Sequence, residues 1–157
     1  MAAADPVLRV LERFAEEGVE YVLVGGQAVR LNGYARATED VDVLLRATRD
    51  NGERVRRALG HLEAAAELDP AWFEPAPDGS LENVRVADDV LVDLLLTANG
   101  ETYESVKPFI RELEIDGVPV RVLNVDGLLR TKTTWREKDV LDRAVLTRLR
   151  EGRDPEA

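Results

Sequence analysis

Hydrophobic positions recur at helical spacing in three parts of this chain. The first is 5–18, where Asp5 and Pro6 form an N-terminal cap and Gly18 ends the pattern. The second starts at the capping residue Thr48 and ends at Leu59 or Leu62, and the third covers 126–150. We therefore predict helices in these three stretches, each with one apolar side turned toward a core.

Short apolar or alternating runs predict strands in the remaining parts of the chain. The runs 81–86 and 90–96 flank the turn at 87–89, and 109–115 and 118–123 flank Asp116-Gly117, which is the strongest hairpin signal. Two further strands are expected at Val22-Leu23-Val24 and through Arg36, Thr38, Asp40 and Asp42. The pattern predicts an α+β fold, with a mixed central sheet flanked by helices and a helical C-terminus. We expect one domain over 1–150 and a disordered tail over 151–157.

Composition and charge narrow the classes of function. The chain has 157 residues, 45% of them hydrophobic, and no cysteine, which fits a reducing cytoplasm and excludes cysteine-based zinc sites. The N-terminus does not resemble a signal peptide and no run has the length of a membrane span, so we expect a cytoplasmic protein with no membrane partner. A net charge of −10 disfavours broad nonspecific nucleic-acid binding but leaves room for a local basic groove.

A pair of glycines follows the first predicted strand. Gly25 and Gly26 let the backbone turn sharply and come close to a ligand. The run 27–32 after them predicts a short helix, whose N-terminal N–H groups would face an anion such as a nucleotide phosphate. The pattern indicates a phosphate-binding turn.

Two aspartates follow on the second strand. Asp40 and Asp42 are alternate strand residues, so they lie about 6.6 Å apart on one face. Two such anions repel by roughly 2.5 kcal/mol at an effective dielectric constant near 20, which a bound divalent cation reverses. The alternative is an exposed strand edge where both acids are simply solvated. The apolar residues around them favour the metal site.

A third acid, Asp93, interrupts the apolar run 90–96. Buried carboxylates are normally paired, protonated or bound to metal, so Asp93 is the natural third metal ligand. The alternative places Asp93 on the solvated face of an edge strand.

The order of these features resembles the DNA polymerase beta-like nucleotidyltransferase superfamily. The shared pattern is an apolar strand, Gly-Gly, a short helix, Arg-x-Thr-x-Asp-x-Asp and a later strand with one carboxylate. Among the branches of the superfamily, the chain is most similar to the minimal nucleotidyltransferases and the abortive-infection type E toxins. The resemblance implies a nucleotidyltransferase fold.

The resemblance also implies a mechanism and a set of site residues. A nucleoside monophosphate would pass from a nucleoside triphosphate to a hydroxyl of RNA or protein, with release of pyrophosphate. The implied Mg²⁺ ligands and catalytic residues are Asp40, Asp42 and Asp93, and the implied nucleotide-binding residues are Gly25, Gly26, Arg36, Thr38, Lys132 and Arg136. For the C-terminal helix, an exposed surface with i,i+4 ion pairs is the alternative.

The leading hypothesis is therefore an active Mg²⁺-dependent nucleotidyltransferase in a toxin-antitoxin system, with a cognate toxin or antitoxin as partner. The alternative is a catalytically inactive module of the same fold that binds a nucleotide or a partner. The charge gives little support to a third hypothesis, a plain nucleic-acid-binding domain. Trp72 and Phe73 either attach their proline-rich loop to the core or form a base-stacking surface.

Overall fold

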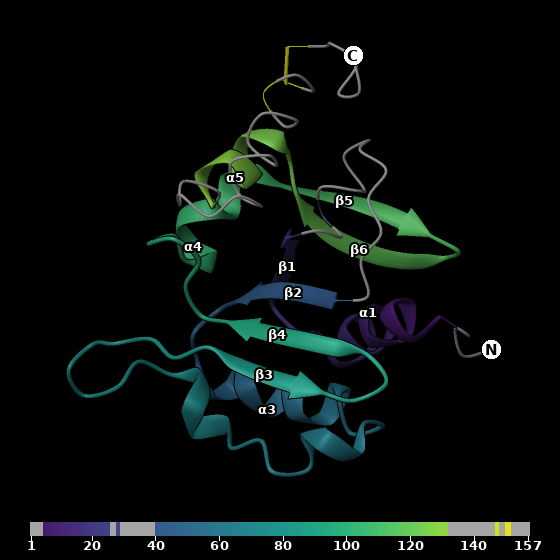
Figure 1. Ribbon diagram of the computed structural model, residues 1–157, viewed down its shortest axis with the longest axis vertical. Coiled ribbons are helices and arrows are strands. Elements are labelled where there is room, and N and C mark those ends of the chain that lie inside the picture. The colour runs from purple at the N-terminus through teal and green to yellow at the C-terminus, as the bar shows by residue number, and fades with distance from the viewer. Residues whose placement is uncertain (1–4, 26–27, 29–39, 132–146, 148–149, 152–157) are drawn as a thin grey trace.

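The structure is a computed structural model that describes residues 5–25, 28, 40–131, 147 and 150–151 (Figure 1). Several sequence predictions lie outside these residues. They are the helix 27–32, most of the C-terminal helix, nearly all of the tail, and the site residues Gly26, Arg36, Thr38, Lys132 and Arg136.

The described strands form one mixed sheet of six strands in the order β3-β4-β2-β1-β6-β5 (Figure 1). The pairs β1–β2, β3–β4 and β5–β6 are antiparallel, and the pairs β2–β4 and β1–β6 are parallel. The predicted α+β class with a mixed sheet is confirmed. The strands are β1 (Tyr21–Val24), β2 (Asp40–Leu45), β3 (Val84–Ala87), β4 (Leu91–Leu95), β5 (Ile110–Ile115) and β6 (Val118–Leu123).

The first two predicted helices form with the predicted caps. Helix α1 (Pro6–Glu17) begins where the Asp5 carboxylate accepts hydrogen bonds from backbone N–H groups, and it ends at Gly18 in the left-handed conformation. Helix α3 (Arg49–Ala58) begins where the Thr48 hydroxyl accepts from the Asn51 N–H. Shorter helices are α4 (Tyr103–Val106), α5 (Val125–Arg130) and the 3₁₀ turns η1 (Glu63–Ala65), η2 (Pro70–Phe73) and η3 (Lys107–Phe109). None in the described part of the chain is long and apolar enough to cross a membrane.

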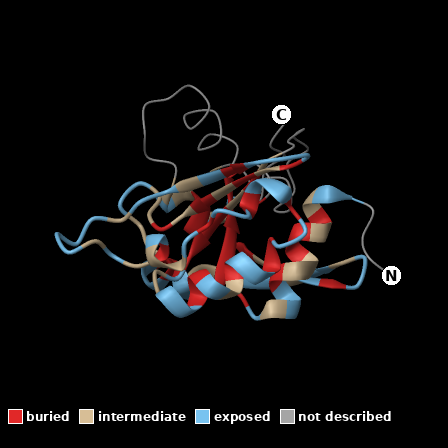
Figure 2. Cartoon of the chain, turned by 90° about the horizontal axis from the view of Figure 1, so that it is seen from below, coloured by how far each residue is buried: buried red, intermediate tan, exposed pale blue. Residues whose placement is uncertain are grey.

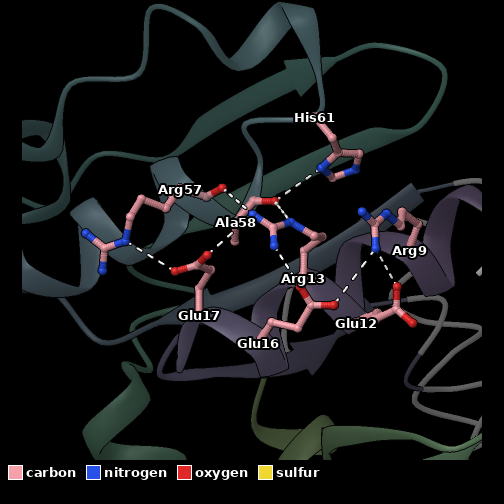
Figure 3. A network of polar contacts seen from close by, with 8 residues as sticks. All are labelled: Arg9, Glu12, Arg13, Glu16, Glu17, Arg57, Ala58 and His61. Atoms are coloured by element: carbon pink, nitrogen blue, oxygen red, sulfur yellow. Dashed lines mark hydrogen bonds and ion pairs between the residues drawn. The ribbon is translucent and has the colours of Figure 1, made fainter. Parts of the chain in front are cut away.

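A polar network attaches α1 to the C-terminal end of α3 (Figure 3). The Arg13 guanidinium donates to the carbonyl oxygens of Arg57 and Ala58, at 2.9 and 3.2 Å, at a helix end where these carbonyl groups lack an i+4 partner within the helix. The ring of His61 contacts the Ala58 carbonyl at 3.2 Å, and Arg57 pairs with Glu17. These contacts give His61 a structural position at the helix end.

The strands in the centre of the sheet have two different faces. Alternate residues such as Val41, Val43, Val92 and Leu94 are fully buried and belong to one hydrophobic core. Figure 2 shows these buried positions in the middle of the molecule, with the buried sides of helices turned toward them. The residues between them, including Asp40, Asp42 and Asp93, are only partly buried. The acids therefore lie on the more open face.

Both predicted hairpins are confirmed, with one boundary corrected. The strand expected to start at Leu81 starts at Val84, because the Asn83 side chain instead accepts hydrogen bonds from the N–H groups of Leu96 and Thr97. At the other hairpin, Asp116 and Gly117 both adopt positive φ, as this tight turn requires.

Candidate functional site

One row of residues crosses four strands of the sheet. Arg85 on β3 is the register partner of Asp93 on β4, Asp93 is the partner of Asp42 on β2, and Asp42 is the partner of Val24 on β1. Register partners have their side chains on the same face of a sheet. The row thus places the carboxylates of Asp42 and Asp93 side by side, and Asp40 lies on the same face two residues before Asp42.

The turn at Gly25, directly after β1, lies at one end of this row. Gly25 has a φ of +70°, and a Cβ atom added to it would lie 2.1 Å from the Asp42 Oδ2 atom and 2.9 Å from the Asp42 Cβ. The backbone therefore passes directly against the Asp42 carboxylate. Both the left-handed conformation and this lack of space require glycine. The close approach of the glycine pair to a ligand stays a prediction, and in this structure the Gly25 backbone lies against a carboxylate of the protein itself.

Arg85 forms a charged pair at the other end of the row. Its Nε atom donates to Asp93 Oδ1 at 2.7 Å, and its Nη2 atom donates to Asp93 Oδ2 at 3.2 Å. The Asp93 side chain is 17% exposed and the Arg85 side chain 61%. The pKa of Arg85 is raised, mainly by the hydrogen bond to Asp93 and its charge, with smaller contributions from Asp40 and Asp42. The guanidinium therefore lies in the field of all three acids.

Arg85 was not among the predicted site residues, although the spacing of the β3–β4 hairpin indicates its position. In a hairpin centred on Asp89, residues at equal distances from the turn face each other, so Arg85 must face Asp93. The strand order of the sheet places β4 between β3 and β2. Asp93 is therefore not on an edge strand, which was the alternative interpretation of this residue.

The chemistry of the acids suits a hard divalent cation. Carboxylate oxygens are preferred ligands of Mg²⁺, which is usually bound by one or two carboxylates together with substrate phosphates. Asp40 and Asp42 offer that donor set. Within the described residues, no three His, Cys, Asp or Glu side chains are grouped so that they could hold a metal ion, and Asp93 pairs with Arg85. A cation bound at these two carboxylates would need further ligands from outside the described residues.

The structure thus brings together Gly25, Asp40, Asp42 and Asp93. The two aromatic residues of the proline-rich loop are separated: Phe73 is buried against Gly52, whereas Trp72 is 46% exposed. Trp72 borders a hollow of about 510 Å³ that Val84 also lines. Because Val84 and Arg85 are consecutive strand residues on opposite faces, this hollow does not open onto the row of acids.

The mixed sheet with its helices has a nucleotidyltransferase fold. The chain is similar over 92% of its length to the crystal structure of a Thermotoga maritima protein whose assignment as a nucleotidyltransferase is itself provisional. The TM-score is 0.51, the sequence identity is 14%, and the match covers 84% of that protein. At this identity the likeness establishes the fold. No family model and no curated protein matches the sequence.

Proposed function

We propose that this protein is a Mg²⁺-dependent nucleotidyltransferase that transfers a nucleoside monophosphate from a nucleoside triphosphate to a hydroxyl group of RNA or protein. The observation that carries the proposal is the register of Asp42 against Asp93 beside the Gly25 turn, within a nucleotidyltransferase fold. Carboxylates on adjacent interior strands are costly to keep together unless a cation compensates for their charge.

In this proposal, Asp40 and Asp42 hold the cation. Bound Mg²⁺ would neutralise charge on the triphosphate and stabilise the pyrophosphate that leaves. Gly25 keeps the backbone close to the Asp42 carboxylate and so fixes its orientation. Gly26, Arg36, Thr38, Lys132 and Arg136 remain proposed phosphate-binding residues on the strength of the sequence resemblance.

Asp93 is the proposed residue on the acceptor side of the site. The acceptor hydroxyl oxygen attacks the α-phosphorus, a new P–O bond forms, and the bond from that phosphorus to the pyrophosphate oxygen breaks. The hydroxyl proton passes to a carboxylate, for which Asp93 is the candidate because it lies beyond Asp42 as seen from the Gly25 turn. Asp93 would also help to hold the cation.

The proposal includes a biological setting. The sequence resemblance to small prokaryotic toxins supports a role in a cytoplasmic toxin-antitoxin system, with a cognate protein as partner.

One observation favours a second candidate function, an inactive module that binds nucleotide without transferring it. The Arg85 guanidinium already neutralises Asp93, the acid that the proposed chemistry needs at the acceptor. A protein that kept this pair permanently would bind a nucleotide and release no pyrophosphate.

The deciding experiment measures pyrophosphate release from each of the four ribonucleoside triphosphates with Mg²⁺, in the presence of total cellular RNA and protein. The intact chain is compared with the double variant Asp40→Ala/Asp42→Ala. We expect release with at least one nucleotide by the intact chain and none by the double variant.

A matched control uses Glu112→Ala/Glu114→Ala, which removes two exposed acids at the same spacing on β5. This control is expected to release pyrophosphate at the rate of the intact chain. Nucleotide binding without release under any condition would establish the inactive module instead. Full release by the Asp40→Ala/Asp42→Ala variant would show that the site is elsewhere.

A further inference from the structure

Arg85 has an unusual position for a surface arginine. Its side chain is mostly exposed, yet two of its nitrogen atoms, Nε and Nη2, donate to the partly buried carboxylate of Asp93, at 2.7 and 3.2 Å. Two-point pairs of this kind are geometrically specific and stronger than single contacts. The exposed pair of Arg49 and Glu74, on α3 and the loop after η2, offers a comparison, because both of its members are well exposed.

The register fixes where Arg85 acts. Along the row, the positive charge of Arg85 is followed by the negative charges of Asp93 and Asp42, and then by the Gly25 turn. The guanidinium therefore compensates for the acids from the side opposite to the turn. A divalent cation bound at Asp42 would compensate for the same charges.

We propose that Arg85 is the resident counter-ion of this carboxylate row, and that it holds Asp93 until a divalent cation and its nucleotide displace it. The inference rests on the proposed function, because it concerns the same acids. It adds a form of regulation: the cation affinity of the site is set by competition with an arginine of the same chain. Arg85 is thus a positioning residue that acts through Asp93.

The competition has a direct consequence for metal binding. Replacing Arg85 by a neutral side chain leaves the acids with one more uncompensated negative charge, so the site attracts a divalent cation more strongly. Arg85→Gln should therefore lower the dissociation constant for Mn²⁺, used as a spectroscopic substitute for Mg²⁺, on the order of tenfold. Arg85→Lys keeps the charge but loses the two-point geometry, so it should bind Mn²⁺ nearly as the intact chain does.

The test is a Mn²⁺ titration of the nucleotide-free protein, followed by the electron paramagnetic resonance signal of the free ion. It compares the intact chain, Arg85→Gln, Asp93→Asn and the double variant. If Arg85 acts through Asp93, the gain from Arg85→Gln is much smaller in the Asp93→Asn background. Arg49→Gln, which breaks an exposed pair elsewhere, is the matched control and should leave the affinity unchanged.

The outcomes separate this inference from the proposed function. Mn²⁺ binding with equal affinity in the intact chain and in Arg85→Gln would overturn the role of Arg85 and leave the proposed function standing. An equal gain from Arg85→Gln with and without Asp93 would also overturn it, because the arginine would then act only as a distant charge. No Mn²⁺ binding in any nucleotide-free variant would likewise overturn the role of Arg85, whereas the proposed function is decided separately by pyrophosphate release. Circular dichroism melting checks that each variant is folded.

Discussion

The carboxylate row, taken here with Asp40 on the same face, and the β5–β6 hairpin share two sequence features but differ in burial and strand pairing. Each has a pair of acids at alternate strand positions, Asp40 with Asp42 and Glu112 with Glu114, and each has a glycine at positive φ. In the hairpin, the acids are exposed on an edge strand, and Glu112 faces Arg121 in register. In the row, the acids are half-buried on an interior strand, and Asp42 faces another acid.

The difference shows which features separate a pair of acids suited to binding a cation from a pair that is only solvated. Spacing alone does not distinguish the two regions, because both place two carboxylates on one face of a strand. The register partner and the burial distinguish them, since an exposed acid beside an arginine is solvated and compensated. Half-buried acids beside a third acid need a further cation. Substitutions matched between the two regions can test this conclusion.

The largest effect is expected from the acids themselves. Asp40→Ala/Asp42→Ala should lower nucleotide transfer about a thousandfold or more, roughly 4 kcal/mol of transition-state stabilisation, because the cation loses its ligands. Glu112→Ala/Glu114→Ala should leave the rate within about twofold, since such surface changes usually have small effects. Pyrophosphate release at saturating nucleotide measures both. Equal losses in the two variants would remove the distinction between the regions.

A smaller effect is expected at the two glycines. Gly25→Ala should lower transfer about a hundredfold, because its Cβ must push the Asp42 carboxylate out of place. Gly117→Ala has the same conformational strain of about 1–2 kcal/mol but open space around its Cβ, so it should lower stability without lowering the rate. Initial rates and thermal melting of both variants distinguish the effect of backbone strain from the effect of displacing the Asp42 carboxylate. A similar loss of rate in Gly117→Ala would indicate that strain alone is responsible.

The smallest effect concerns the turns of the two hairpins. Asp88 in the β3–β4 turn accepts hydrogen bonds from the N–H groups of Ala64 and Asp89, which lower the pKa of its carboxyl. A lowered pKa in the folded state stabilises the protein above the ordinary carboxyl pKa, and this contribution is lost as the pH falls through the lowered value. Asp88→Asn should therefore lower the melting temperature slightly at pH 7, with the difference from the intact chain shrinking toward pH 3.

Asp116→Asn is the matched change in the β5–β6 turn. Asparagine tolerates the positive φ of this position, so the melting temperature of the variant should stay close to that of the intact chain at every pH. A loss as large as that of Asp88→Asn would mean that the two turns are equally anchored.

Local signals in the sequence were sufficient for much of this fold. The caps of α1 and α3 and the turns of both hairpins depend on residues close together in the chain, so Asp5, Gly18, Thr48 and Gly117 predicted them. The helix α4, within a segment where no structure was predicted, depends on the reciprocal cap of Thr102 and Ser105.

Such local signals do not predict the register between strands that are far apart in the sequence. Asp40 and Asp42 were predicted as a pair and Asp93 as a separate third acid, but the pairing of β2 with β4 that aligns Asp42 with Asp93 depends on packing of the whole sheet. The pair of Arg85 and Asp93 depends only on the register of the β3–β4 hairpin, which the turn at 87–89 sets. Trp72 and Phe73 are adjacent in sequence, so only tertiary packing decides which of them is buried.

The strand order also has a consequence for how the protein folds. The β5–β6 hairpin joins neighbours in the chain and can close early, whereas β1 must find β6, with Leu23 aligned to Val122, across most of the described sequence. Loop closure over such distances is slow, and high contact order delays folding. The carboxylate row also needs a long-range pairing, that of β2 with β4, so during synthesis its acids cannot meet before β4 has left the ribosome. A site assembled in this way cannot form while the first half of the chain is being translated.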